Sequence, residues 1–132
     1  MKLQPDPKQS LNTVTRYDAN YIEINEIRFE SSIFLMPEGN IGHWNVRRFE
    51  DLQQTDFSHI LDIKPALVIF GSGQKIRFPK PALLQNLIQA RIGFETMDTQ
   101  AACRTYNILM SEGRFVMGLF LIGNEWVVQH LK

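Results

Sequence analysis

The sequence predicts an α/β protein whose central mixed sheet has a βαβαβ core and a terminal antiparallel hairpin, preceded by an antiparallel β meander. Three observations lead to this fold class. Apolar residues alternate with polar ones between Tyr21 and Val46, which is typical of antiparallel strands with one buried face. The runs 66–70 and 115–122 are almost continuously apolar, which is typical of strands covered on both faces. Between these runs the apolar residues recur at helical spacing.

A single domain fits the length of 132 residues, since chains of this size form one hydrophobic core. Residues 1–15 are polar and contain Pro5 and Pro7, so we expect a loosely ordered tail before a domain that spans residues 16–132. The chain is 44% hydrophobic and 21% charged, as is usual for globular proteins. Its 14 basic and 14 acidic residues balance, which argues against a nucleic-acid partner.

No segment predicts direct insertion into a membrane or export. The longest uncharged apolar run, 115–123, is much shorter than the ~18 residues that cross a bilayer. The first residues have no apolar core and are not arginine-rich, so neither a signal peptide nor a transit peptide is expected. A single cysteine excludes an intramolecular disulfide. We therefore expect a cytoplasmic protein.

The expected meander contains three pairs of alternating apolar residues, which are Ile22 with Ile24, Ile27 with Phe29, and Ile33 with Leu35. Asn25-Glu26 predicts a tight turn between the first two strands, and 37–40 predicts another turn. Trp44 and Val46 continue the alternation. A short helix follows, with Thr55 as its N-cap, and it ends before Pro65 because the residue preceding a proline disfavours helical geometry.

The βαβαβ core begins with the strand at 66–70. Pro79 and Pro81 open a helix that ends before Gly93, and 94–97 forms the next strand. Asp98 or Thr99 caps a second helix, which stops at Gly113 and buries a stripe of Ala102, Cys103, Tyr106, Leu109 and Met110. Two right-handed crossovers make the three strands parallel, and Gly123-Asn124 predicts a turn into an antiparallel strand at 126–128.

Candidate site residues cluster where two parallel strands end. Ligands of open α/β sheets bind at the carboxyl ends of such strands, which here carry Gly71-Ser72-Gly73 and Asp98-Thr99. The glycines and the helix after Asp98 could receive a small anion. A third glycine is missing, since position 76 is Ile, and no Gly-Lys-Ser/Thr follows, so dinucleotide and P-loop chemistry are not supported. A simple turn at the strand end is the favoured interpretation.

Cys103 and Arg104 are the remaining candidates at this rim. A nucleophilic cysteine needs a lowered pKa, from a helix N-terminus or a nearby cation. Cys103 lies in the second helical turn and within the apolar stripe, so a buried structural cysteine is favoured. Arg104 projects about 100° away around the helix, where it could bind an anionic ligand or hold Glu95 or Asp98.

No metal site and no cofactor are predicted. His43, His59 and His130 are scattered without ligand spacing, and one cysteine adds little to them.

Two segments resemble a known family. The run from Ala66 to Phe70 that ends in Gly-Ser-Gly, and MDTQAACRTYN at 97–107 followed by EGR at 112–114, are similar to the Mth938-like domain family of unknown function. That family includes the mitochondrial respiratory complex I assembly factor three and an adipogenesis-associated animal protein. Many relatives have Gly-Thr-Gly where this chain has Gly71-Ser72-Gly73.

The resemblance implies a three-layer α/β domain around a mixed sheet and provides no established catalytic residue. It favours a non-enzymatic, assembly-factor-like protein that binds an unidentified protein partner. The alternative is an enzyme that binds a small molecule or anion around Ser72, Asp98, Cys103 and Arg104. A mitochondrial role is not carried over, because no transit peptide is expected.

Overall fold

The computed structural model describes residues 11–123. Its strands are β1 (Val14–Asp18), β2 (Tyr21–Ile24), β3 (Ile27–Phe29), β4 (Ile33–Leu35), β5 (Gly42–His43), β6 (Leu67–Gly71), β7 (Gly93–Met97) and β8 (Val116–Phe120). Its helices are α1 (Ser58–Ile63), α2 (Gln85–Gln89) and α3 (Thr99–Ser111), with 3-10 turns η2 (Phe49–Asp51), η3 (Gln54–Phe57) and η4 (Pro81–Leu84). Within the described residues, no helix is long and apolar enough to cross a bilayer.

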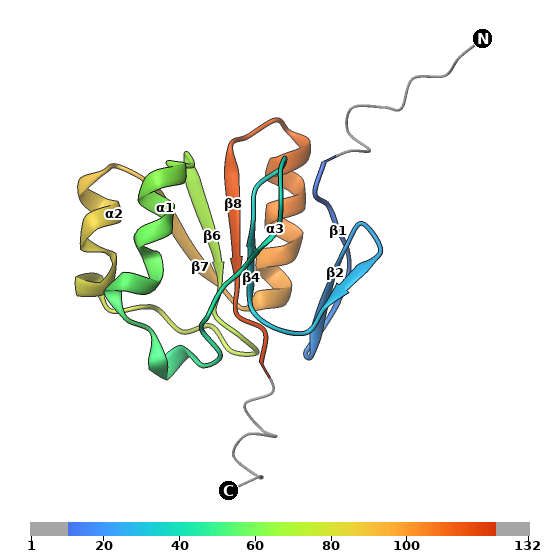
Figure 1. The fold of residues 1–132 in the computed structure, drawn as a ribbon, viewed down its shortest axis with the longest axis horizontal. Coiled ribbons are helices and arrows are strands. Elements are labelled where there is room, and N and C mark those ends of the chain that lie inside the picture. Colours follow the sequence, from blue (N-terminus) through green and yellow to red (C-terminus); the bar gives the residue numbers. More distant parts are fainter. Residues whose placement is uncertain (1–10, 124–132) are drawn as a thin grey trace, which may run out of the picture.

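The central sheet has five strands in the order β5-β4-β8-β6-β7 (Figure 1). Strand β6 pairs in parallel with both β7 and β8, and β4 pairs antiparallel with β8. The predicted mixed sheet with three parallel strands is therefore confirmed. Strands β1, β2 and β3 form a separate antiparallel sheet.

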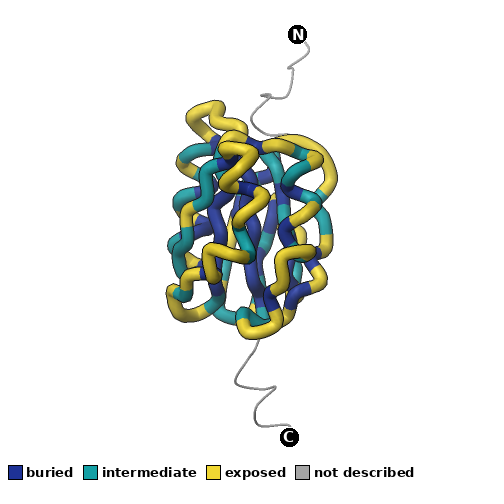
Figure 2. Tube along the Cα trace, turned by 90° about the vertical axis from the view of Figure 1, so that its left-hand side faces the viewer, coloured by how far each residue is buried: buried dark blue, intermediate teal, exposed yellow. Residues whose placement is uncertain are grey.

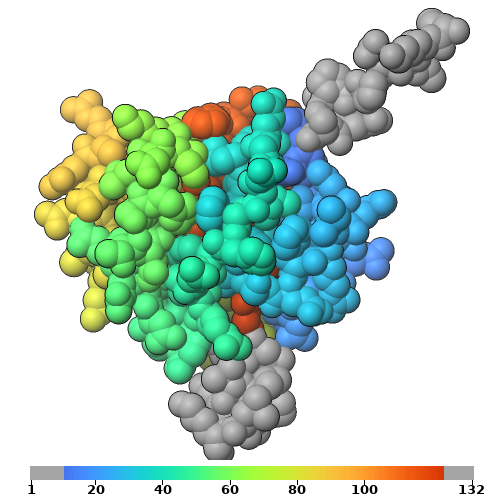
Figure 3. Space-filling model, in the orientation of Figure 1, coloured from blue at the N-terminus to red at the C-terminus, as the bar shows by residue number. Residues whose placement is uncertain are grey.

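Two hydrophobic cores lie on opposite faces of the central sheet, which gives the predicted three layers. Alternation along β6 explains them, because Ile69 joins the core under α3 while Val68 and Phe70 join the core under α1 and α2. The buried residues of Figure 2 follow the inner strands. Figure 3 shows that the segment between β4 and β6 covers most of the β8 strand on one face. A continuous apolar run is thus required by burial on both faces.

The meander predicted at residues 21–46 is divided between the two sheets. Strands β2 and β3 form the expected hairpin, and Asn25 and Glu26 both have positive φ, at 49° and 72°. Strand β4 instead joins the central sheet beside β8. Period-two alternation places a side chain on one face of a strand but does not specify which sheet the strand joins.

Two local expectations differ from the structure. Strand β1 begins at Val14, inside the segment 1–15 that was expected to be a loose tail. The cap of η3 is Gln53, paired with Asp56 in a capping box, rather than Thr55. The expected strand at 126–128 lies outside the described residues, and within them both edges of β8 are already paired, to β4 and β6.

Candidate functional site

The two strand ends expected to form a rim are joined directly to each other. The backbone N–H of Thr99 donates to the carbonyl of Gly73 at 2.8 Å, and the N–H of Gly73 donates to Thr99 Oγ1 at 2.9 Å. The Ser72 N–H donates to the Met97 carbonyl at 2.8 Å. The structure therefore brings Gly71-Ser72-Gly73 and Asp98-Thr99 together, but their polar groups face one another.

Gly71 is required for close packing between β6 and α3. A Cβ atom at this position would lie 2.9 Å from the Cα and Oγ1 of Thr99 and 3.2 Å from the Cβ of Ala102. The Thr99 hydroxyl also donates to the Leu121 carbonyl at 3.0 Å. The glycine at the end of β6 thus lets the helix approach the strand, which is a packing role.

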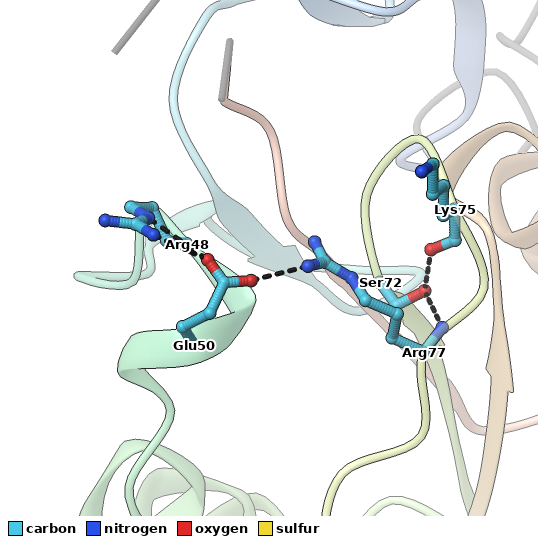
Figure 4. Close-up of polar contacts among 5 residues, drawn as sticks. All are labelled: Arg48, Glu50, Ser72, Lys75 and Arg77. Carbon is cyan, nitrogen blue, oxygen red and sulfur yellow. Dashed lines mark hydrogen bonds and ion pairs between the residues drawn. The ribbon is translucent and has the colours of Figure 1, made fainter. Parts of the chain in front are cut away.

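Ser72 organises the loop that follows β6 (Figure 4). Its side chain is fully buried, and its Oγ accepts the Arg77 N–H at 2.9 Å. The same hydroxyl lies 2.7 Å from the Lys75 carbonyl and 3.1 Å from the Met97 carbonyl, to which it can donate. These contacts use the hydrogen-bonding capacity of a serine, so no free hydroxyl faces solvent.

The same loop is fixed to η2 by a cluster of charged side chains. Glu50 accepts hydrogen bonds from Arg77 and from Arg48, the latter at 2.9 Å (Figure 4). The Arg77 guanidinium also lies 4.8 Å from the centre of the Phe49 ring. Burial acts to raise the pKa of Glu50, but the hydrogen bonds and charges of the two arginines outweigh it and lower that pKa. This cluster was not predicted from the sequence, because η2 and the loop are far apart in the chain.

Asp98 is the N-cap of α3, as expected. Its Oδ1 accepts the N–H of Ala101 at 2.9 Å, and its backbone is extended, with φ −62° and ψ 159°. The carboxylate therefore already occupies the positive end of the helix.

A cavity of about 430 Å³ opens beside this cap. The residues that line it are Asp18, Ala19, Gly73, Gln74, Asp98, Thr99, Gln100, Leu121, Ile122 and Gly123. As far as the described chain goes, they include two carboxylates and no lysine or arginine. Neither Ser72, Cys103 nor Arg104 is among them.

Cys103 lies in the core beneath α3 and is fully buried. Burial raises the pKa of its thiol to about 12, the Arg104 charge opposes that shift, and Asp98 reinforces it. The raised pKa keeps the side chain a neutral thiol. A nucleophilic cysteine needs a lowered pKa, so Cys103 is not suited to nucleophilic attack.

Arg104 is exposed on the opposite side of the helix from the core. Its Nη1 donates to the Tyr17 hydroxyl at 3.1 Å, which connects α3 to β1. The expected link from Arg104 to Glu95 or Asp98 is therefore replaced by a link to the small sheet.

Two further residues of the helix also bind the N-terminal strand. The Tyr106 hydroxyl donates to the Asn12 carbonyl at 2.8 Å. Asn107 accepts the N–H of Val14 at 2.9 Å through Oδ1 and donates to its carbonyl at 2.8 Å through Nδ2. Tyr106 was expected in the apolar stripe and Asn107 had no predicted role, since neither spacing nor composition identifies a partner 93 residues away.

In the described part of the chain, no group of three His, Cys, Asp or Glu side chains is arranged to hold a metal ion. His59 lies 4.4 Å from the Phe34 ring, centre to centre, and its buried Nε2 has no hydrogen-bond partner within residues 11–123. Burial lowers the pKa of His59, and the Asp56 and Asp62 carboxylates oppose this only partly.

Comparison with known proteins identifies the family. The family described as "Protein of unknown function (DUF498/DUF598)" matches residues 14–121. The chain belongs to this family. DUF498/DUF598 relatives include the bovine protein named NADH dehydrogenase (ubiquinone) 1 alpha subcomplex assembly factor 3, which is 31% identical over 111 residues. That match covers 83% of this chain and 59% of the bovine protein, so the chain spans less than two thirds of its relative's length.

Solved structures of DUF498/DUF598 relatives confirm the predicted Mth938-like fold. A crystal structure of a Bordetella parapertussis protein is 39% identical with a TM-score of 0.82, and the match covers 88% of this chain and 99% of that one. The solution structure of a Bordetella pertussis protein, described as a Mth938-like domain, is 34% identical with a TM-score of 0.77 and 92% coverage of both chains.

Proposed function

We propose that the chain is a non-enzymatic binding protein that acts in the assembly or maintenance of a larger protein complex. One observation carries this proposal: the side chains that could have been catalytic instead hold the fold together. The Cys103 thiol is buried with a raised pKa, the Ser72 hydroxyl is buried among three backbone groups, and Asp98 caps α3. Nucleophilic catalysis needs an activated group within reach of a base, and these residues provide none.

The named relatives support the same proposal. The bovine relative is named as an assembly factor for NADH dehydrogenase, and assembly factors act by binding other proteins. For this chain, both the existence of a protein partner and its place in a larger complex are proposed.

Affinity capture tests the proposal. The tagged full-length chain, expressed at native level and cross-linked in cells, is expected to enrich a specific protein partner over a tag-only control, as quantified by mass spectrometry. The partner should also bind the purified chain directly. If cross-linked capture from native cells recovers no specific partner, the binding proposal is wrong.

A second candidate is a small-molecule site in the cavity beside Asp98. The cavity volume of about 430 Å³ is within the range of ligand pockets. Of the four residues in the enzyme hypothesis, Asp98 is the one that lines it. A thermal-shift screen of uncharged and charged metabolites, repeated with Gln74→Trp to fill the cavity, is the test. A ligand whose stabilising effect disappears in Gln74→Trp would favour this second function.

The proposal does not extend to a small anion at the N-terminus of α3. The Asp98 carboxylate already accepts the Ala101 N–H, and Asp18 adds a second acidic residue to the cavity. Desolvating an anion beside two carboxylates is unfavourable.

We propose the cytoplasm as the location of this protein, on the composition of the sequence and its single free cysteine. Cell fractionation of the untagged protein tests this, and recovery in a membrane or organelle fraction would contradict it.

A further inference from the structure

Strand β7 forms one edge of the central sheet. It pairs with β6 on one side, and within residues 11–123 no strand pairs with its other side. The Gly93 N–H donates to the Ala66 carbonyl at 3.2 Å, and the Met97 carbonyl accepts the Ser72 N–H at 2.8 Å. Both end residues of β7 therefore point toward β6.

The alternation of a strand then assigns its free backbone groups. The N–H and C=O of one residue point to the same side, and successive residues point to opposite sides. Because Gly93 and Met97 point inward, Phe94 and Thr96 present their N–H and C=O groups outward. A row of such groups is a template for pairing with another chain.

An open groove of about 490 Å³ runs beside this edge. It is lined by Phe78, Pro79, Leu84 and residues 94–97. The Phe78 side chain is 69% exposed, and Ile76, two residues earlier, is 52% exposed. A large apolar side chain next to free strand groups is the arrangement that strand-adding recognition sites use, in which main-chain bonds give affinity and side-chain pockets give selectivity.

The chain segment that contributes Phe78, Pro79 and Leu84 to the groove is basic, although the whole chain has equal numbers of basic and acidic residues. Between Ile63 and Phe94 the sequence has no acidic residue and five basic ones, which are Lys64, Lys75, Arg77, Lys80 and Arg91. Arg77 pairs with Glu50, whereas Lys75, Lys80 and Arg91 are exposed and form no ion pair within the described residues. Among residues 11–123, Glu95 is the single carboxylate that lines the groove.

We propose that the groove along β7 binds an extended acidic segment of a partner protein, which adds a strand to the free edge and places an apolar side chain against Phe78. This inference rests on the proposed binding function and specifies the chemistry of the partner. The basic side chains of the segment that carries Phe78 would favour an acidic partner and accelerate its association. A second copy of this chain is a poorer occupant, because a symmetric pairing of two β7 edges would bring the two basic stretches together.

The test uses the isotope-labelled full-length chain and two synthetic decapeptides. One alternates valine with glutamate, and the other alternates valine with lysine. The acidic peptide is expected to shift the amide signals of Phe94 and Thr96, slow their hydrogen exchange, and bind at least about tenfold more tightly than the basic peptide. Equal binding of the two peptides, or shifts confined to other strands, would overturn the proposal.

Matched variants distinguish binding at the groove from nonspecific binding. Phe78→Ser and Lys80→Glu are each expected to weaken the acidic peptide by about tenfold. Phe115→Ser and Arg114→Glu replace an exposed phenylalanine and an exposed basic residue that lie outside residues 63–94, and they should leave binding unchanged. Circular dichroism confirms that each variant is folded, which is expected because all four side chains are exposed.

Other occupants of the edge give distinct results. Protection of Phe94 and Thr96 amides in the free monomer would show that another part of the chain already pairs with β7, and a dimer abolished by Phe78→Ser would show a second copy there. Either result overturns the proposal. If a partner captured from cells binds Phe78→Ser and Lys80→Glu as tightly as wild type, the groove assignment fails while the binding function stands. If no partner is captured but the acidic peptide still binds at β7, the binding function fails instead.

Discussion

The side-chain amide of Asn107 forms two hydrogen bonds with the backbone of Val14. They are the same two bonds that a neighbouring strand would form. Its Oδ1 accepts the Val14 N–H at 2.9 Å, and its Nδ2 donates to the Val14 carbonyl at 2.8 Å. The amide group has the same donor and acceptor as a peptide bond, so it pairs with β1 as backbone would. In this way α3 holds the small sheet against the central one.

Asn107→Ala should destabilise the protein by about 2 kcal/mol, because it leaves the partly buried N–H and C=O of Val14 without partners. Urea unfolding followed by circular dichroism measures the change. Ser111→Ala, on the same helix but exposed, is the matched control and should change stability by less than about 0.5 kcal/mol. Equal stability of the two variants would contradict the bridging role.

Gly71→Ala should destabilise the protein by about 1–3 kcal/mol, the range for added atoms in a packed interior. The new Cβ would lie 2.9 Å from the Cα of Thr99, which is backbone and cannot rotate away. Gln100→Ala, which changes an exposed residue in the first turn of α3, is the control. Thermal unfolding provides the comparison, and a Gly71→Ala protein as stable as wild type would show that α3 shifts without cost.

Cys103 should resist alkylation in the folded protein. Burial raises the pKa of the thiol to about 12, so it is almost entirely neutral at pH 8, and the side chain is enclosed by the core. Iodoacetamide labelling followed by mass spectrometry should therefore report global unfolding, with rapid modification only in denaturant. Fast labelling at pH 8 without denaturant would show that the thiol is accessible and would reopen the enzyme hypothesis.

His59 should make the folded protein less stable as the pH falls below about 6.5, its ordinary pKa. Burial lowers the pKa of the folded imidazole, so the unfolded chain binds the proton more readily. The resulting stability is fully present above pH 6.5 and is lost as the pH falls toward the lowered pKa.

His59→Gln removes the titrating group and provides the measurement. Urea unfolding at pH 8 and at pH 5.5 should show a smaller loss of stability in the variant than in wild type. His43→Gln, which changes an exposed histidine, is the control. An identical pH dependence of wild type and His59→Gln would rule out a role for the buried ring.

Much of the candidate site could be placed from the sequence, but its use could not. Turn and capping chemistry is local, so Asp98 could be identified as a cap and Gly71-Ser72-Gly73 as the end of a strand. The resemblance to the family lay in the same residues. The partners of these residues lie far away in the sequence. The Ser72 hydroxyl bonds to the Met97 carbonyl, and the Thr99 hydroxyl bonds to the carbonyl of Leu121, 22 residues further along the chain. A motif that appears suited to chemistry is therefore explained largely by packing.

The sequence by itself determined the order of the elements, the parallel direction of β6, β7 and β8, and the two-sided burial of the inner strands. These features follow from hydrophobic period, turn residues and the handedness of crossovers, all of which act over short distances along the chain. Only the tertiary structure decided that β4 leaves the meander to pair with β8, that Cys103 is enclosed, and that no other strand within residues 11–123 pairs with the edge of β7 beside Phe78. Those outcomes depend on which distant segments compete for the same edge or core, and a one-dimensional pattern carries no information on that competition.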